Sequence, residues 1–370
     1  MSTTAAPRRA VVPFAITAER RLETPRRLPL LTTLGAVAVA LIISGILILL
    51  IGGDPIASFG HILVSSFGSL GVLSDTLVKA TPLIFTGLAC ALAFRMRLWN
   101  IGAEGQFYLG AWGASAIVLV PVIPPGSSAL LTVPLMLVAG FAAGASWGFI
   151  AGWLRARFNV NEIIATLMLN YIAILWVQFW VFGPWSESGF QLTKQFPKEA
   201  WLPRLTDLTS AVPGFSGLTI HLGLAFALAA AFLVWFVLKR TRKGYEIRLI
   251  GDNAQAARYA GVNISRTIVL VMLVSGGLAG LGGMSEVGGA VHRLQDSISP
   301  GYGFTGVIIA YLAKFNPLYV IIAAIAFGAL ILAGREIQPA GIPSMIQGVI
   351  LFAVIASDVL LRYRLRVVRR

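Results

Sequence analysis

Charged residues are scarce in this chain of 370 residues, because only 12% are Asp, Glu, Lys or Arg while 57% are hydrophobic. An ordinary soluble domain holds about 25% charged residues. The apolar residues form runs of roughly 20, the length that crosses about 30 Å of hydrocarbon as a helix. The short alternating segments of a transmembrane β-barrel are absent. We therefore expect an all-α, polytopic membrane protein.

The residues that usually carry catalysis are also few. The one cysteine, Cys90, lies inside an apolar run, which excludes a disulfide framework and a cysteine-based metal site. No lysine is followed by Ser or Thr, so the chain lacks a P-loop of its own and any nucleotide energy must come from a partner. The three histidines, His61, His221 and His292, are far apart in sequence, and we interpret them as interfacial or loop residues. An enzyme acting alone is therefore disfavoured.

Ten apolar segments have the hydropathy of membrane-spanning helices. They cover residues 30–52, 76–95, 99–120, 130–153, 161–182, 218–238, 267–290, 302–314, 317–334 and 342–361. The eighth is short, so a tilted, broken or re-entrant helix is an alternative there. An even number of spans puts both termini on the same side of the membrane.

Basic residues predict the orientation of the chain. A basic extension at residues 1–29 precedes the membrane domain at 30–361, and a basic tail follows at 362–370. With both termini in the cytoplasm, 23 of the 29 Lys and Arg residues fall on the cytoplasmic side, in agreement with the positive-inside rule. The apolar run after residue 29 lacks a small-residue cleavage pattern, so we interpret it as a retained span. The net charge of +14 thus indicates membrane lipid as the contact, and no nucleic acid.

A polar break at residues 239–266 lies between two apolar spans. Its Asp252 is a good helix N-cap and Gly261 a natural stop, which predicts a helix of about two turns between them. Ala256, Tyr259 and Ala260 would share one face of that helix. Because so short a helix is marginal alone in water, it must dock, either on another protein or on its own bundle and lipid headgroups.

Several polar residues fall inside the predicted spans. The candidates for a translocation path are Asn100, Glu104, Gln106, Glu162, Thr166 and Asn170. Ionisable groups in hydrocarbon are costly and normally face a bundle interior or a pathway. The spacing of four from Glu162 to Asn170 places three of them on one helix face, which suits a polar path or, equally, hydrogen bonds that hold the bundle together. Asp358 is interpreted as an interfacial residue paired with Arg362.

A ladder of glycines runs along the fourth predicted span. It consists of Gly140, Gly144, Gly148 and Gly152. Small residues at intervals of four let two helix backbones approach closely in a membrane. We interpret the ladder first as a packing surface, with a direct role in solute passage as the alternative.

Four motifs, taken in order, carry a resemblance to a known family. They are LWNIGAEGQFYLGAW, FNVNEIIATLMLNYIA, GDNAQAARYAGVNISR and ISPGYGFTGVIIAYLAKFNP. From Thr76 to Leu361 the chain resembles the membrane permease subunits of ABC importers of the branched-chain amino acid and ribose type, most closely the nucleoside and simple-sugar permeases. Lys314 departs from the small residue expected before the Asn-Pro step, which puts the geometry of the eighth span in question.

The resemblance implies a transport subunit that binds no cofactor itself. ATP and Mg would be used by a separate ABC ATPase subunit, and the residues implied to contact it are Gly251, Asn253, Ala256, Ala257, Arg258, Gly261 and Ile264, beside Tyr259 on the predicted docking face. The other implied partners are a second, smaller permease and an external or periplasmic solute-binding lipoprotein that docks on loops including residues 183–217. The implied location is the bacterial inner membrane, and the implied mechanism is alternating access for nucleosides, with pentose sugars and other small polar solutes as alternatives.

Two other functions agree with parts of the sequence. A secondary transporter driven by an ion gradient would use Glu104, Glu162 and Glu286 as ion or proton sites. A membrane scaffold or receptor would need no polar interior at all. The polar residues inside the predicted spans favour transport over a scaffold.

Overall fold

The computed structural model describes residues 14–20, 25, 28–120, 124, 126–334 and 341–369. Most of the predicted extension at 1–29, including five of its six arginines, and Arg370 in the tail lie outside the described residues. Within them the chain is a polytopic bundle of helices, α1 to α13. Their bounds are Leu28–Leu50 (α1), Pro55–Phe67 (α2), Leu70–Arg95 (α3), Ala103–Leu119 (α4), Ala129–Phe158 (α5), Glu162–Phe182 (α6), Gly223–Arg240 (α7), Arg242–Asp252 (α8), Ala254–Tyr259 (α9), Ile264–Ser285 (α10), Tyr302–Leu312 (α11), Pro317–Ala333 (α12) and Ile342–Arg362 (α13).

Every segment predicted to span the membrane coincides with a helix. Seven helices of the described residues are long and apolar enough to cross a bilayer: α1, α3, α5, α6, α7, α10 with its continuation to Val291, and α13. The other three are shorter, with 17 residues in α4, 11 in α11 and 17 in α12. A membrane protein with several spans is therefore confirmed, whereas the number ten stays a prediction.

Parts of the structure differ from the expected helices and loops. Helix α2 fills a segment predicted as a loop, starting at Pro55 with Asp54 as its N-cap. The all-α prediction is wrong at the ends of the chain, where β1 (Phe14–Arg20) pairs antiparallel with β2 (Tyr363–Arg369). Apolar residues alternate with arginines in the stretch 363–367, and this period of two favours a strand.

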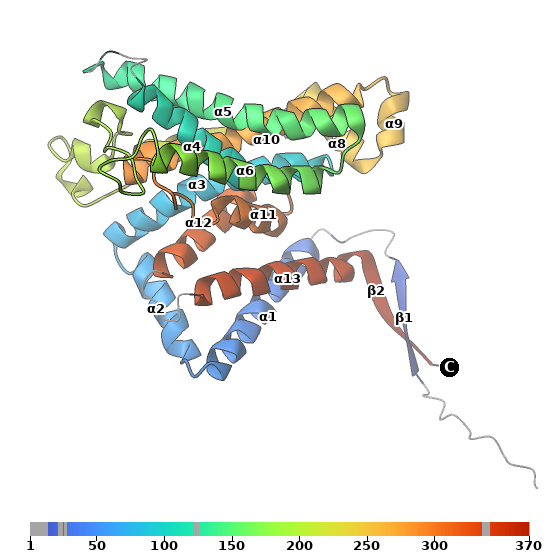
Figure 1. Ribbon diagram of the computed structural model, residues 1–370. Coiled ribbons are helices and arrows are strands. Elements are labelled where there is room, and N and C mark those ends of the chain that lie inside the picture. The colour runs from blue at the N-terminus through green and yellow to red at the C-terminus, as the bar shows by residue number, and fades with distance from the viewer. Residues whose placement is uncertain are drawn as a thin grey trace, which may run out of the picture.

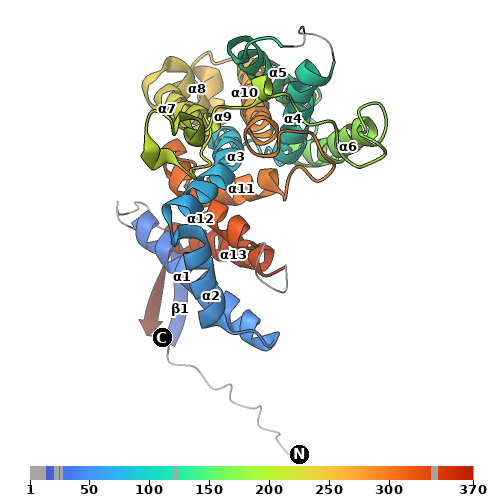
Figure 2. The same ribbon diagram turned by 90° about the vertical axis from the view of Figure 1, so that its left-hand side faces the viewer.

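The helices form two groups joined by α3, α11 and α12. In Figures 1 and 2 α4, α5, α6 and α10 lie together on one side, while α1, α2 and α13 lie together on the other. The strand pair lies at the end of the bundle that carries α9 (Figure 1), whereas the long loop between α6 and α7 lies at the opposite end. Both ends of the described chain and the break 239–266 thus share one end of the bundle, as the predicted topology requires.

Burial distinguishes the central helices from the peripheral ones. Most residues of α3 and α10 are buried. Large apolar side chains are exposed instead on α1, α6, α7 and α13, for example Ile42, Phe179, Phe232 and Phe352. Since a soluble protein rarely exposes so much contiguous apolar surface, these faces fit a lipid or subunit environment.

The glycine ladder of α5 lies directly on a second glycine ladder in α10. A Cβ atom added to Gly144 would fall on the carbonyl oxygen of Gly276, and one added to Gly152 would lie 2.7 Å from the Cβ of Met272. In return, a Cβ at Gly280 would fall on the carbonyl oxygen of Gly140. The two backbones are therefore in contact, which only the absence of side chains on both surfaces permits.

The packing predicts that a methyl group added on this face of α5 lowers the stability of the fold, whereas one added at a position with open space does not. We expect Gly144→Ala to destabilise the purified chain by about 1–3 kcal/mol, because overpacking forces the two backbones apart. The measurement is the midpoint of thermal unfolding in detergent. Gly348→Ala is the matched control: it lies in α13 with open space around it, so its midpoint should stay unchanged or rise. Equal midpoints for the two variants would contradict the packing.

Candidate functional site

A polar cavity opens where α3, α10, α11 and α13 approach the end of the bundle opposite α9. Its volume is about 400 Å³, within the range of roughly 300–1,000 Å³ that is typical of small-molecule sites. Its lining includes Lys79, Glu286, Gln295, Ser299, Tyr302 and Gln347. Among its lining residues only Lys79 and Glu286 are charged.

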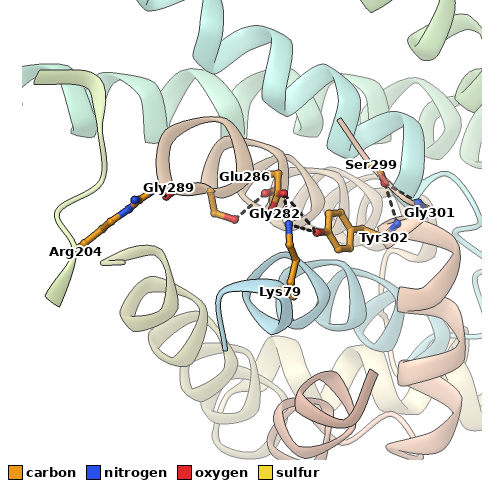
Figure 3. Close-up of polar contacts among 9 residues, drawn as sticks. Lys79, Arg204, Gly282, Glu286, Gly289, Ser299, Gly301 and Tyr302 are labelled. Carbon is orange, nitrogen blue, oxygen red and sulfur yellow. Dashed lines mark hydrogen bonds and ion pairs between the residues drawn. The ribbon is translucent and has the colours of Figure 1, made fainter. Parts of the chain in front are cut away.

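An ion pair forms one wall of this cavity (Figure 3). The Nζ of Lys79 lies 2.9 Å from Oε1 of Glu286 and donates a second hydrogen bond to the Tyr302 hydroxyl at 3.2 Å. That hydroxyl in turn lies 3.4 Å from the same carboxylate oxygen. The side chains are 12% and 3% exposed for Lys79 and Glu286, so both charges are largely removed from solvent. Lys79 is a functional candidate that the sequence reasoning missed, although a lysine inside an apolar span is itself a signal.

Glu286 lies at the start of a π-helix, Glu286–Val291, that continues α10. Short π segments inside helices are rare and occur often at functional sites. The loop between α6 and α7 crosses this π-helix: Leu202 N–H donates to the Gly288 carbonyl at 2.8 Å, and Arg204 donates through Nη2 to the Gly289 carbonyl at 2.8 Å (Figure 3). The outer loop is thus attached to the segment that carries Glu286.

Two of the three histidines, His221 and His292, lie close together at this attachment although they are far apart in the sequence. Arg204 donates to Nε2 of His292, whose ring stacks on Trp201 with centroids 3.8 Å apart. A Cβ at Gly289 would touch the ring of His221, so both rings pack at the end of the π-helix. They do lie in loops, as interpreted, and the described residues contain no group of three or more His, Cys, Asp or Glu that could hold a metal.

The predicted path residues lie elsewhere, in a buried polar cluster beside α4. Asn100 donates to Gln106 and to Ser275, each at 2.8 Å, while Asn170 accepts from Gly105 N–H at 2.8 Å and donates to the Ile101 carbonyl at 2.9 Å. These bonds join α4 to α10 and to α6. The cluster is nearly inaccessible, with Asn100 0% exposed and Asn170 2% exposed.

The remaining path candidates are also engaged within the chain. Glu104 accepts from the Gly303 N–H at 2.6 Å and so connects α4 to α11. Thr166 donates to the Glu162 carbonyl one turn earlier, and the Glu162 carboxylate pairs with Arg155 at 3.3 Å. The bonds of Glu104 and of the Glu162 carboxylate join different helices, whereas the Thr166 bond lies within α6. A role in the path stays a prediction for each residue.

Asp358 has an ion-pair partner that the sequence did not suggest. Asp358 lies 2.6 Å from Lys314, whereas the Arg362 side chain proposed as its partner lies outside the described ones. Lys314 and Phe315 both have positive φ, 49° and 58°, and they end the short α11 before Asn316 caps α12. The unexpected Lys314 therefore lies in a tight turn between helices.

The break at 239–266 contains two helices instead of the single one predicted. Thr241 caps α8 by accepting from Gly244 N–H at 3.1 Å. Asp252, expected as the N-cap of the second helix, is the last residue of α8, and Asn253 caps α9 by accepting from Gln255 N–H at 2.9 Å and Ala256 N–H at 3.1 Å. Gly261, with φ of 75°, then provides the stop as predicted.

Helix α9 presents one face to the outside. Tyr259 is 93% exposed, and Ala256, Arg258 and Ala260 are exposed beside it. Gly251 and Ala257 differ from the expected contact set, because both are buried within the chain: a Cβ at Gly251 would fall on the Arg95 carbonyl, and Ala257 is 0% exposed. In this conformation they position α8 and α9 and are not themselves presented to another protein.

A groove runs alongside α9. It has a volume of about 440 Å³ and is lined by the ends of α3, α8 and α10 together with Arg155 of α5, and its residues include Arg97, Asp252, Gln255 and Ile264. Ile264, the first residue of α10, is half-buried at this groove. The exposed face of α9 and the groove together form one surface, which we term the α9 surface.

Comparison with known proteins assigns the chain from α3 into α13 to one family. Residues 72–355 match the family described as the permease component of the branched-chain amino acid transport system. The chain belongs to this family of ABC transporter permeases. It matches no solved structure. Membership agrees with the resemblance from Thr76 to Leu361 and makes the chain a non-catalytic transport subunit.

Relatives in this family carry more specific names. The chain is 35% identical over 346 residues to a glucose ABC transporter permease protein of Haloferax volcanii, covering 91% of this chain and 88% of the relative. It is 34% identical over 330 residues to a guanosine ABC transporter permease protein of Bacillus subtilis, covering 86% and 91%. A second guanosine permease protein of Bacillus subtilis is 27% identical over 260 residues, covering 70% and 79%.

Because two histidines pack where the outer loop is attached to the π-helix, we expect this attachment to weaken at acidic pH. Burial, with a smaller effect of Arg204, lowers the pKa of His221 to about 3 and that of His292 to about 4, against about 6.5 in an unfolded chain. Both rings are neutral in the fold. Their contribution to the stability of the folded state is therefore complete above about pH 6.5 and is lost as the pH falls towards 4. We expect hydrogen exchange in residues 196–222, corrected for its intrinsic pH dependence, to rise over this interval.

Variants separate this effect from general acid damage. His292→Gln should flatten part of the pH dependence, because Gln can accept from Arg204 without gaining a proton. His61→Gln in α2, distant in the fold from Arg204, should leave the dependence as in the unaltered chain. Exchange that is independent of pH between 7 and 4 in the unaltered chain would refute the assignment.

Proposed function

We propose that this chain is one of two permease subunits of an importer that moves nucleosides across the bacterial inner membrane. The observation that carries the proposal is the exposed α9 surface at one end of the bundle, with a polar cavity at the other. Family membership supports transport driven by a separate ATPase. The guanosine permease relative supports nucleosides as the first substrate class, and the glucose relative supports sugars as the second.

The partners follow from this arrangement. An ABC ATPase subunit, using ATP and Mg, would dock on the α9 surface, where Tyr259 is the exposed aromatic anchor and Arg258 a neighbouring charge. A second and smaller permease would complete the path, a pairing supported by the two guanosine permease proteins of Bacillus subtilis. A solute-binding lipoprotein would dock at the opposite end, on the loop at 183–217.

The mechanism is alternating access by rigid-body motion. Asn253 and Asn263 cap α9 and α10 in turn, so the docking helix passes through a short turn into α10. From Ile264 to Glu286 the chain is continuous helix, roughly 33 Å at 1.5 Å per residue. Closure of the ATPases would move α9 and tilt α10, which carries Glu286 at its far end. The path residues Asn100, Glu104, Gln106, Glu162, Thr166 and Asn170 stay candidates for its inner part.

Transport driven by an ion gradient has less support. The three carboxylates that it would need each have a separate partner: the Gly303 N–H for Glu104, Arg155 for Glu162 and Lys79 for Glu286. An ABC permease also obtains its energy from its ATPase.

If the ATPase subunit docks on the α9 surface, removal of the Tyr259 side chain should weaken its binding to the permease. We expect Tyr259→Ala combined with Arg258→Glu to weaken binding of the ATPase subunit about tenfold or more, because exposed aromatic and arginine side chains are the common hot spots of interfaces. The measurement is co-purification of the ATPase with the permease in detergent. Ala257 is left unaltered because it is buried, and changing it would disturb the fold.

Lys194→Glu provides the matched control. Lys194 is exposed in the outer loop, so the same reversal of charge is made at the opposite end of the bundle. Its ATPase binding should equal that of the unaltered chain. If the Tyr259 and Arg258 variant retained the ATPase as fully as the control, the α9 surface would not be the docking site.

A further inference from the structure

The Lys79–Glu286 pair is an unusual feature for a bilayer-embedded helix bundle. Lys79 lies nine residues, roughly 14 Å, after the start of α3, and Glu286 lies at the end of the long α10 span. Taking two charges out of water is costly, and replacing such a pair by apolar residues often leaves stability unchanged or improves it. Bundle stability alone is therefore a weak reason for the pair.

Hydrogen bonding within the pair is incomplete. Among the described residues the second carboxylate oxygen of Glu286, Oε2, is buried without a hydrogen-bond partner. Lys79 uses two of its three N–H donors, on Glu286 and on Tyr302. The unmet acceptor and the remaining donor thus belong to two paired residues that both line the cavity. Buried polar atoms usually have partners, and seven side-chain atoms of the described residues do not; among these seven, Glu286 Oε2 is the one that belongs to a residue lining this cavity, which points to a ligand there.

We infer that the cavity is a solute-contact site in the outer half of the translocation path, selective for uncharged solutes that carry hydroxyl groups. This inference rests on the proposed function. A hydroxyl can accept from Lys79 and donate to Glu286 in the same position, so it matches both unmet groups. The charges of the pair cancel, which favours a neutral solute over an anion or a cation.

The rest of the lining agrees with such a solute. Gln295, Ser297, Ser299, Ser344 and Gln347 supply uncharged donors and acceptors. Tyr302 adds an aromatic ring beside Lys79, whose Nζ lies 6.0 Å from the ring centroid. The volume of about 400 Å³ admits a molecule of nucleoside or sugar size.

The position of the site suits transfer from a docked protein. The outer loop is bonded to the π-helix through Leu202 and Arg204, and Figure 3 shows Arg204 beside Gly289, within one turn of Glu286. A movement of that loop would therefore reach the π-helix that carries the Glu286 carboxylate. At the other end of α10 lies the α9 surface, so the site is located between the two docking regions.

The test uses the complete importer in proteoliposomes, with guanosine and glucose as probes. The variant is Lys79→Met together with Glu286→Gln, which removes both charges at similar volume and leaves no unpaired charge behind. We expect ATP hydrolysis in the presence of loaded binding protein to continue, while the solute moved per ATP falls about tenfold, because the lost contacts act on the solute and not on the ATPase. A ratio of solute transported to ATP hydrolysed equal to that of the unaltered complex would refute the solute-contact site.

Two further variants provide a control and an independent test of the cavity. Lys314→Met with Asp358→Asn removes an ion pair of the same bundle away from the cavity, and it should leave solute per ATP unchanged. Ser344→Trp narrows the cavity without touching the ion pair, so it decides the question if the first variant does not assemble. Solute per ATP that is unchanged in Ser344→Trp would also overturn the site.

Failure of the proposed function gives a different pattern. An unaltered complex that shows no ATP-dependent movement of either probe would overturn the importer for these solutes, and this site with it. An unaltered complex that transports, beside a cavity variant that transports equally well per ATP, would overturn the site alone.

Discussion

The close approach of α10 to its neighbours is the constraint on which the rest of the structure depends. Glycines on one face of α10 touch the glycine ladder of α5, and glycines on other faces touch α4 at the Phe107 carbonyl and α3 at Phe85. Between membrane helices the hydrophobic effect provides little attraction, so van der Waals contact at short range must hold them together. Because α10 is fixed on three sides, both of its ends have defined surroundings: Ile264 beside α9, and Glu286 beside Lys79.

Polar groups in this bundle are used in two physically different ways. The cluster around Asn100, Gln106 and Asn170 is almost closed to solvent, and its bonds run between helices. Fully paired buried networks rigidify a fold and specify a single packing. The group around Lys79 and Glu286 faces a cavity and is incompletely paired. Completeness of hydrogen bonding, rather than polarity alone, thus distinguishes residues that hold the bundle from residues available to a solute.

Hydropathy predicted the helical bundle well, since each of the ten apolar segments coincides with a helix. It could not predict α2 and α8, because short helices with polar faces obtain their stability from tertiary contacts. The cap of α9 was placed one residue early, at Asp252 instead of Asn253, because both residue types cap well and only the end of α8 distinguishes them. The Lys79–Glu286 pair could not be predicted as a pair, since 207 residues separate its members. Only the packing of α3 against α10 brings them together.

A permease without a P-loop could be driven by ATP if one rigid element connected the surface proposed for the ATPase to the surface proposed for the solute. Helix α10 has this property, since its first residue lies at the α9 surface and its last turn, the π-helix, is bonded to the outer loop. A π segment has a looser hydrogen-bond ladder than an α-helix, so it can absorb a local change while the rest of α10 moves as a unit. The tight glycine contacts oppose bending along the helix and leave this last turn as the place where it can yield. Under the proposed mechanism, motion that enters at α9 would therefore be expressed at Glu286, which lines the cavity.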